Sequence, residues 1–318
     1  MPHGKIAIGQ SAFSASQVAN LYGCGFGTKL EMYSNYIGQP MEKEISESSK
    51  TSMEFGTFFE ESVARFMSKK KGWTLIRCGE TAYWREDMPY LICHPDRLLR
   101  GRDDKGRRVA IEIKCVAPYA EGWGEEGTSE IPPHYYLQVQ TYYACGVPCD
   151  VVLLWCLRGN RVYEYEILPD KAIIKDIRKR VRETKESFDK GIVPETETFE
   201  ESKAFWSRRQ DPSVESRVAG DEGRELWERA KKAKAESDRA EKELDEAKRL
   251  LSDFLGPYPS VVTTEGGKLV KIAYWGSRTR SSLNEERFAE NHPDIDLGKY
   301  RETKTSSVLN IKWDKKEK

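Results

Sequence analysis

The most constraining stretch of the sequence is an apolar run at residues 109–116 that carries one acid and one lysine, two positions apart. β-Branched residues dominate the run, which predicts a strand. Because side chains alternate between the faces of a strand, Glu112 and Lys114 share one face, and Ile111 and Ile113 share the other. Two charges on an otherwise buried strand are costly unless another group pairs with them.

A third charge, Asp96, precedes this strand across a loop rich in Asp and Gly at residues 100–108. Such a loop predicts a hairpin, in which two adjacent strands bring Asp96, Glu112 and Lys114 together. Two carboxylates that share a hard divalent cation, with an ammonium beside them, suit metal-assisted phosphodiester hydrolysis. The simpler alternative is a surface hairpin with an ordinary Glu–Lys pair, because so short a pattern is degenerate by itself.

The composition limits the class of protein to which this hairpin belongs. Lysine plus arginine and aspartate plus glutamate each number 52 of the 318 residues, so a basic surface must come from segregated charge. The seven cysteines include no close C-x-x-C pair, and no apolar run approaches the length of about 18 residues that spans a membrane. With no secretory segment at the start, we expect a reduced protein in the cytoplasm.

Residues 53–67 predict a helix with an aromatic-rich face that we expect to be buried. Its members are Phe55, Phe59, Val63, Phe66 and Met67. Glu60 lies at the edge of this face, and Gly56, one turn earlier, would allow another backbone to approach closely. A solvated glutamate is the simpler interpretation of Glu60. Residues 38–51, before this helix, are polar and expected to be mobile.

Polar groups also occur on two other predicted helices. Ser14 or Ser16 begins the first, either as a cap or as a hydroxyl that contacts a phosphate at a helix start. The glycine-rich residues 23–27 then predict a loop, because they lack any nucleotide-binding spacing. A helix over residues 134–145 follows Pro132 and Pro133, and it places Gln138 and Tyr142 one turn apart on one face.

The remaining pattern predicts an α/β core and a separate C-terminal part. Strands are expected at residues 73–77, 81–84, 90–93, 151–156 and 161–167, and a helix with a basic outer face at 170–188. We predict a core at 1–193, a linker at 194–219 and an extension at 220–318. The extension has a long helix at 220–255 with a coiled-coil-like seam, followed by strands at 261–264, 268–275 and 307–313.

The ordered motifs resemble a known family. Asp96, Glu112-Ile-Lys114 and Gln138, with Ser14-Ala-Ser16 and Gly56-x-x-x-Glu60, resemble those of the YqaJ-type phage recombinase nucleases. These are similar to lambda exonuclease and belong to the PD-(D/E)xK superfamily. The resemblance covers about residues 12–190, and residues 225–312 resemble the C-terminal extension of longer YqaJ-type proteins.

The resemblance implies a fold and a set of metal ligands. The fold is a restriction-endonuclease-like core, with a mixed central sheet flanked by helices, followed here by a long helix and a small β unit. Asp96 and Glu112 would hold metal with the main-chain carbonyl of Ile113, and Glu60 would complete a second metal site. Lys114 would orient or activate the attacking water.

The resemblance also implies substrate contacts. Gln138 would steady the lysine and the region of the scissile phosphate, while the segment with Ser14 and Ser16 would hold a 5′-phosphate. An arginine expected about two helical turns before the serine is replaced here, with Gly9 nearest its place. Lys5, Lys29 and Arg97 are the candidates to take over its role.

The implied activity is Mg²⁺-dependent hydrolysis of linear double-stranded DNA in the 5′→3′ direction, with two ions and with Mn²⁺ as a substitute. It would leave 3′ single-stranded DNA for phage-type homologous recombination. The implied partner is a RecT-like single-strand annealing protein, and the implied assembly is a homo-oligomer, such as a ring-shaped trimer. A phage- or prophage-encoded protein of the bacterial cytoplasm fits this set.

Two alternatives stay open. The first is an endonuclease, or a PD-(D/E)xK nuclease with an iron–sulfur cluster held by Cys24, Cys145, Cys149 and Cys156. The second is a catalytically inactive DNA-binding scaffold. Closed circular DNA separates an endonuclease, which nicks it, from an exonuclease, which leaves it intact.

Overall fold

The computed structural model describes residues 3–4, 12–41, 45–79, 81–210, 213–265, 268–274 and 288. The chain forms two compact units, an N-terminal unit (Met1–Arg208) and a C-terminal unit (Arg209–Lys318), which we describe separately. The N-terminal unit therefore extends beyond the expected core boundary at residue 193. The extra residues include a helix, α5 (Phe199–Trp206), in which Phe205 is buried against Tyr33.

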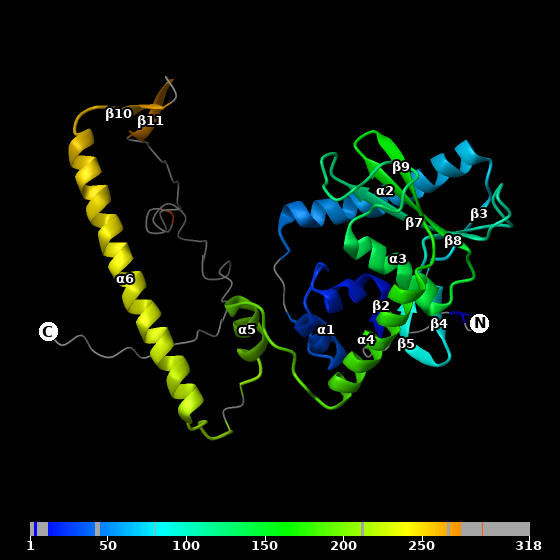
Figure 1. Ribbon diagram of the computed structural model, residues 1–318, viewed down its shortest axis with the longest axis horizontal. Helices are drawn as coiled ribbons and strands as arrows, with labels where there is room; N and C mark the ends of the chain where they lie inside the picture. Colours follow the sequence, from blue (N-terminus) through cyan, green and yellow to red (C-terminus); the bar gives the residue numbers. More distant parts are fainter. Residues whose placement is uncertain are drawn as a thin grey trace. The chain divides into compact units, whose positions relative to one another are not determined.

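The centre of the N-terminal unit is a five-stranded mixed sheet (Figure 1). Its strands, in spatial order, are β3 (Leu75–Arg77), β6 (Arg97–Leu99), β7 (Val109–Val116), β8 (Val151–Arg158) and β9 (Arg161–Ile167). Strands β7 and β8 are parallel, and the other neighbours are antiparallel. The parallel pair requires a crossover, which includes α3 (Pro133–Cys145).

Helices cover both faces of this sheet. The side chains of β8 alternate between the two faces, and because they are apolar on both, each face has to be buried. Val152, Leu154 and Cys156 belong to the buried cluster that includes residues of α3 and of α4 (Lys171–Asp189). The alternate residues, Val151, Leu153 and Trp155, belong to a second cluster with Val63 and Met67 of α2 (Glu47–Lys71). The prediction of an α/β core with a mixed sheet flanked by helices is confirmed.

A second, four-stranded sheet is connected to the first through the segment between β5 and β6. Its order is β1 (His3–Gly4), β4 (Ala82–Arg85), β5 (Met88–Cys93) and β2 (Phe13–Ser14), with β2 parallel to β5. It is followed along the chain by the 3₁₀ helix η1 (Ala15–Tyr22) after β2 and by β6 after β5. Strands β5 and β6 lie in different sheets, so residues 94–96, with Asp96 at their end, form the connection between the two sheets.

Helix α2 differs from its prediction in length and in its buried face. It begins at Glu47, within the polar stretch that the sequence predicts to be mobile, because the Ser46 side chain accepts a hydrogen bond from the Ser49 backbone N–H and caps the helix. Phe55 and Phe66 are 49% and 58% exposed, so the expectation that both are core residues is wrong. Apolar spacing identifies a helix face, but on this face Val63 and Met67 are buried while Phe55 and Phe66 are exposed.

The C-terminal unit contains α6 (Asp221–Leu255), where the sequence predicts a helix over 220–255. An antiparallel hairpin, β10 (Ser260–Glu265) and β11 (Lys268–Tyr274), follows it. The strand expected at 307–313 lies outside the described residues. None of the helices in the described part of the chain combines the length and the apolar character needed to cross a bilayer.

Candidate active site

The site begins where β6 stops pairing with β7. The two strands pair only at Arg97 with Ile111 and at Leu98 with Ala110. Beyond Ile111 this side of β7 would lose its hydrogen-bond acceptor. The Asp96 carboxylate takes that place, since its Oδ2 accepts a hydrogen bond of 2.7 Å from the Ile113 backbone N–H. The predicted hairpin thus brings Asp96 to the strand that carries Glu112 and Lys114.

The same geometry orients the main-chain carbonyl of Ile113. In an extended strand the N–H and the C=O of one residue point toward the same side of the strand. Because the Ile113 N–H points to Asp96, its carbonyl also points to this side, away from the parallel neighbour β8. Ile113 also lines the cavity described below. The family resemblance implies that its carbonyl oxygen is a metal ligand there.

Glu112 is held by three groups although it is only 2% exposed. Gln138 Nε2 donates to Glu112 Oε1 at 2.8 Å, and Lys114 Nζ lies 2.6 Å from the same oxygen. The hydroxyl of Tyr142 donates to the other oxygen, Oε2. Buried carboxylates persist only when they are paired and hydrogen-bonded in this way. The face of α3 that carries Gln138 and Tyr142 therefore fixes the acid on β7.

Lys114 lies between this carboxylate and an aromatic ring. Its ammonium is over the ring of Tyr135, 5.2 Å from the centroid. Burial lowers the pKa of Lys114, but the Glu112 carboxylate, with smaller contributions from Asp96 and Tyr135, raises it, so the pKa lies above its usual value. The side chain carries a positive charge at neutral pH and is directed at the acids of the site.

Glu60 approaches from α2 and is bound to a buried arginine. Arg97 Nη1 donates to Glu60 Oε1 at 2.9 Å, and Arg97 Nη2 donates to Glu61 Oε2 at 2.8 Å. The same guanidinium donates to the Asp96 carbonyl oxygen at 2.7 Å and is only 4% exposed. Arg97, proposed from sequence as a phosphate contact, is thus occupied by two carboxylates.

The predicted acids surround one cavity of about 940 Å³. Its wall includes Glu60, Asp96, Glu112 and Lys114, together with Cys115 beside them. Burial, and then the charges of Glu112 and Glu60, raise the pKa of Asp96 to about 8. The cavity therefore concentrates negative charge, which a cation would relieve.

The acid side chains do not converge on one point in this arrangement. Within the described residues, no group of three or more His, Cys, Asp or Glu side chains is placed to hold a metal ion. The reason is visible in their partners. Asp96 accepts from Ile113, Glu112 is bound by Lys114, Gln138 and Tyr142, and Glu60 is bound by Arg97.

The structure places the remaining predicted contacts elsewhere. Ser14 Oγ lies 3.1 Å from Ser16 Oγ and donates to Gln17 Oε1, and neither serine lines the acidic cavity. Lys29 is an exposed residue at the start of α1 (Lys29–Tyr36). Lys5 and Gly9 lie outside the described residues. The four cysteines of the iron–sulfur alternative form no metal-holding group among the described residues either.

Sequence reasoning missed several groups at the site. Tyr142 was recognised only as a neighbour of Gln138 on one helix face, and its buried hydroxyl was not assigned a partner. Tyr135 and Phe26 also line the cavity, as do four serines at and after the start of α2. These serines are Ser46, Ser48, Ser49 and Ser52. The capping pattern at Ser46 was the available signal for them.

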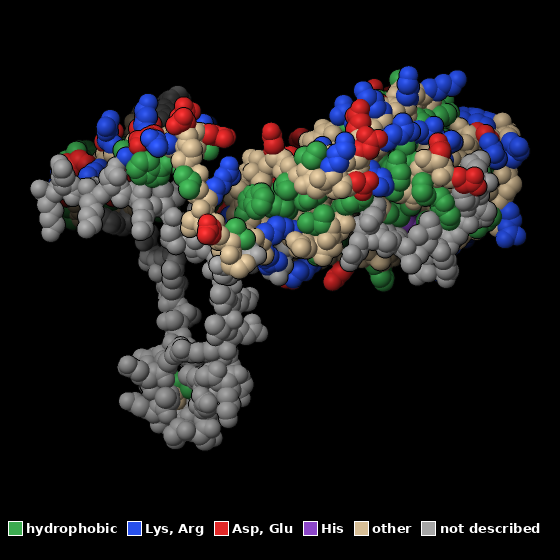
Figure 2. Space-filling model, turned by 90° about the horizontal axis from the view of Figure 1, so that it is seen from below, with side chains coloured by type: hydrophobic (Ala, Val, Ile, Leu, Met, Phe, Trp, Pro, Cys, Tyr) green, Lys and Arg blue, Asp and Glu red, His purple; other side chains and the backbone are tan. Residues whose placement is uncertain are grey.

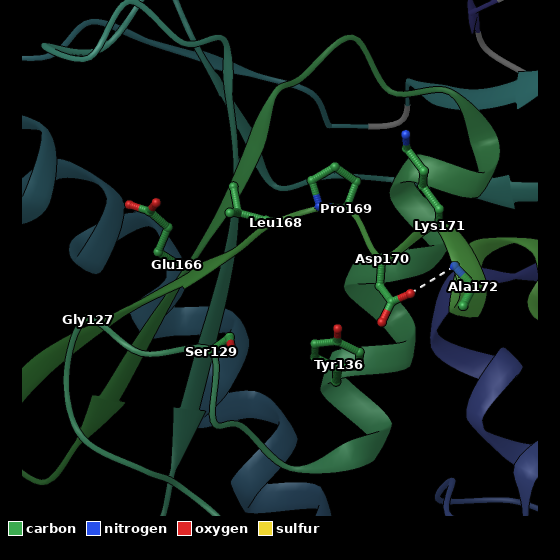
Figure 3. A pocket seen from close by; sticks show the side chains of 9 residues that line it. All are labelled: Gly127, Ser129, Tyr136, Glu166, Leu168, Pro169, Asp170, Lys171 and Ala172. Atoms are coloured by element: carbon green, nitrogen blue, oxygen red, sulfur yellow. Dashed lines mark hydrogen bonds between the residues drawn. The ribbon is translucent and has the colours of Figure 1, made fainter.

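A second open cavity, of about 730 Å³, lies beside the start of α4 (Figure 3). Its acids have structural roles. Asp170 accepts from the Ala172 backbone N–H and so caps α4, as the dashed line in Figure 3 marks. Glu166 pairs with Arg107 at 2.6 Å and with Lys105 at 3.2 Å. The acid–lysine cavity on β7 is therefore the better candidate for catalysis.

Charges on the outer surface of the N-terminal unit are mixed. On the face shown in Figure 2, Lys and Arg side chains are interspersed with Asp and Glu and do not gather into one basic patch. Arg108 and Arg102, for example, pair with Asp150 at 2.6 and 3.8 Å. This distribution agrees with the balanced composition.

Comparison with known proteins gives one family and several solved structures. Residues 7–146 match the YqaJ-like viral recombinase domain. LHK-Exo, an alkaline exonuclease from Laribacter hongkongensis, is 18% identical over 57% of this chain and 90% of its own, with a TM-score of 0.43, or 0.45 in its complex with dAMP. A phage-related exonuclease from Haemophilus somnus 129PT is 13% identical over 57% and 95%, with a TM-score of 0.42. No curated protein matches by sequence.

Proposed function

We propose that this chain, which carries a YqaJ-like viral recombinase domain over residues 7–146, is a metal-dependent exonuclease of linear double-stranded DNA. The family match bears out the resemblance seen in the ordered motifs. The observation that carries the proposal is the cavity in which Asp96, Glu112 and Lys114 meet, with Glu60 opposite on α2. Phosphodiester hydrolysis needs an activated water and a stabilised leaving oxygen, and this set of groups serves both needs.

The donor set fits a hard divalent cation. Three carboxylates and a main-chain carbonyl are oxygen ligands, which Mg²⁺ and Mn²⁺ prefer over nitrogen or sulfur. Asp96, Glu112 and the Ile113 carbonyl would hold one ion, and Glu60 would contribute to a second. Glu60 is partly exposed and pairs with the Arg97 guanidinium, so a bound ion would compete with that arginine for its carboxylate. The bound ions would supply Lewis-acid stabilisation of the developing charge.

The protein's own groups position the reactants. The Lys114 ammonium, anchored on Glu112 and on the Tyr135 ring, is placed to bind a phosphate oxygen or to orient the attacking water. Gln138 binds the same oxygen of Glu112 as Lys114 does, and Tyr142 binds the other, so the two side chains hold the carboxylate in one orientation. Such second contacts to a metal-binding carboxylate set its direction and basicity.

The finer features of the proposal follow from the family resemblance. We infer 5′→3′ digestion that leaves a 3′ strand for recombination and a RecT-like annealing protein as partner. We also infer an oligomer, with a trimer as the first candidate. The segment with Ser14 and Ser16 stays our candidate for the 5′-phosphate contact.

The test is digestion of linear duplexes labelled separately at the 5′ and 3′ ends, with Mg²⁺, with Mn²⁺ and with EDTA. We expect Mg²⁺-dependent release of mononucleotides from the 5′ end, at a rate that differs between 5′-phosphate and 5′-hydroxyl ends. Closed circular duplex of the same sequence should stay intact. Nicking of the circle would favour the endonuclease alternative. DNA binding without cleavage under every condition would favour the inactive scaffold.

A further inference from the structure

Gly56 lies in the interior of the 25-residue helix α2, where glycine is unfavourable. After proline, glycine is the residue that destabilises a helix interior most, because it gains no side-chain contact and loses the most backbone freedom. The φ of Gly56 is not positive, so the backbone conformation does not require glycine. The presence of glycine here therefore needs another explanation.

Packing does not require glycine at this position either. We expected Gly56 to allow the close approach of another backbone. However, an ideal Cβ at Gly56 would have no neighbour within 4 Å outside the helix backbone around it. The contact at this turn is made by the Gly56 carbonyl oxygen, which accepts a long hydrogen bond of 3.9 Å from Cys115 Sγ on β7. A side chain at residue 56 would thus fit within the fold.

The open space beside Gly56 belongs to the acidic cavity. Gly56 lines this cavity together with Glu60 on α2 and with Lys114 and Cys115 on β7. Residues four apart in a helix lie on one face, one above the other. A side chain at residue 56 would therefore occupy cavity space next to Glu60, one of the acids of the proposed site.

The preceding residues on this face of α2 are also small. Ser49 and Ser52 precede Gly56 at helical spacing, and all three line the acidic cavity. The large side chains of Phe55 and Phe59, from the same part of the helix, line a different cavity. Bulk on α2 is thus placed away from the acids, and Gly56 has the least bulk directly before Glu60.

The group that needs this space can be identified from its distance to the acids. One turn of a helix rises about 5.4 Å, so Gly56 lies about that far along α2 from Glu60. Each phosphate of a DNA strand is bonded to two deoxyribose units. A phosphate held at the acids therefore brings a sugar, rather than a base, to within one helical turn of it.

We propose that Gly56 is a specificity-determining residue, whose missing side chain leaves room for the deoxyribose next to the scissile phosphate. The sugar lies against α2 at Gly56 while the phosphate lies at Asp96, Glu112 and Lys114. Glycine serves this role because it lets a ligand approach the helix backbone closely. The proposal rests on the proposed function, since it places DNA in this cavity.

The first experiment measures stability and DNA binding of two variants. Gly56→Ala should raise the melting temperature by about 2–4 °C, because alanine is the best helix former. The Kd for a short duplex, measured in Ca²⁺, should nevertheless rise roughly 10-fold, the effect of one carbon in a fitted pocket. Gly56→Leu should raise it roughly 100-fold, as a displacement of about 1 Å can. A more stable protein that binds DNA less well is the expected signature.

The second experiment makes the substrate smaller at the same place. One set of duplexes carries an acyclic propanediol spacer, which lacks both sugar ring and base, at successive positions near each end. At one position the spacer should return the Kd of Gly56→Leu to that of the parent on the same duplex. A second set carries an abasic residue, which keeps the sugar ring, at the same positions. It should leave the loss in Gly56→Leu unchanged.

Thr51→Leu is the matched control. Thr51 is an exposed residue of α2 that does not line the acidic cavity, so the same side chain there should leave the Kd unchanged. A loss of affinity in Thr51→Leu equal to that in Gly56→Leu would show that added bulk anywhere on α2 is sufficient, and would overturn the proposal.

The other outcomes are also distinct. Parental Kd in Gly56→Leu, or a loss that no spacer position relieves, would overturn the steric role while the nuclease assignment stands. Relief by the abasic residue as complete as that by the spacer would assign the space to a base and overturn the role of the sugar. A melting temperature below the parental value in Gly56→Ala would show that the fold itself needs this glycine. If the parent neither binds nor cleaves any duplex, the proposed function fails together with this inference.

Discussion

Asp96 and Ile113 join the two halves of the proposed active site through one hydrogen bond of 2.7 Å, from the Ile113 backbone N–H to the Asp96 carboxylate. The bond forms where β6 no longer pairs with β7, so the carboxylate replaces a strand neighbour. It links the passage between the two sheets to the strand of Glu112 and Lys114. The position of Asp96 is thus fixed by the end of the pairing between β6 and β7.

Removing the Tyr142 hydroxyl should weaken catalysis more than folding. Tyr142→Phe deletes the hydrogen bond to Glu112 Oε2 but leaves the buried ring, and Gln138 and Lys114 still pair with the other oxygen. Loss of such a supporting contact typically costs about 10- to 100-fold in metal affinity or activity. We expect a kcat reduced by about that factor in DNA digestion, with a melting temperature within a few degrees of the parent.

Tyr143→Phe is the matched control on the same helix. Its hydroxyl donates to the Ile167 carbonyl oxygen, away from the acidic cavity. If both variants lower kcat equally, the Tyr142 hydroxyl has no special role at Glu112.

Arg97 should contribute more to stability than to substrate binding. Arg97→Met removes a buried guanidinium that binds Glu60, Glu61 and the Asp96 carbonyl. Breaking a fully buried pair costs about 3–5 kcal/mol, and the partial exposure of both glutamates reduces our expectation to about 1–3 kcal/mol. Urea denaturation measures this loss.

The matched variant for Arg97 is Arg65→Met, because Arg65 also pairs with Glu61 but is exposed. It should cost at most about 1 kcal/mol. An unchanged unfolding free energy in Arg97→Met, with a large rise in the Kd for DNA, would instead support the phosphate contact inferred from sequence.

The site shows what the sequence could and could not predict. Alternation along residues 109–116 was sufficient to place Glu112 and Lys114 on one face and the isoleucines on the other, since the period of a strand is fixed. It could not show that Tyr142 reaches Glu112, because that contact depends on the position of α3 over the sheet. The sequence also could not show whether Arg97 binds a phosphate of the substrate or pairs with Glu60 and Glu61, because that depends on how α2 lies against β6.

Phe55 and Phe66 of α2 mark the same limit. The three- and four-residue spacing predicted a helix, but a helix face is buried only where another element covers it. Val63 meets β7 and is buried, whereas Phe66, three residues later, is 58% exposed. Spacing alone does not distinguish them.

This difference yields a stability prediction. Val63→Ala should destabilise the protein by about 1–3 kcal/mol through lost burial and a small cavity. Phe66→Ala should change the unfolding free energy by at most about 0.5 kcal/mol, as is typical of surface positions. Chemical denaturation of the two variants measures both. A larger loss for Phe66→Ala would show that its ring is covered in solution.

The Arg107–Glu166 pair should stabilise the fold only above acidic pH. The hydrogen bonds from Arg107 hold the pKa of Glu166 below its usual value, and the two side chains lie 2.6 Å apart. Because the folded pKa lies below the unfolded value of about 4.3, the stabilisation is present above that pH. It is lost as the pH falls through the folded pKa.

We therefore expect Arg107→Gln to cost about 0.5–1 kcal/mol at pH 7, and less as the pH falls below about 4. Unfolding free energies of parent and variant across pH 3–7 test this. A difference that stays constant over the range would show that Glu166 is not the partner that matters.

Digestion of an end-labelled linear duplex by Lys114→Ala, compared with the parent in Mg²⁺, tests the central claim most directly. The account predicts that cleavage falls by at least about 100-fold, the lower end of the range for a positioned catalytic group. The melting temperature and the Kd for DNA, measured in Ca²⁺, should stay near those of the parent, because Gln138 and Tyr142 still bind Glu112. Digestion by Lys114→Ala at the parental rate would contradict the assignment of this cavity as the active site.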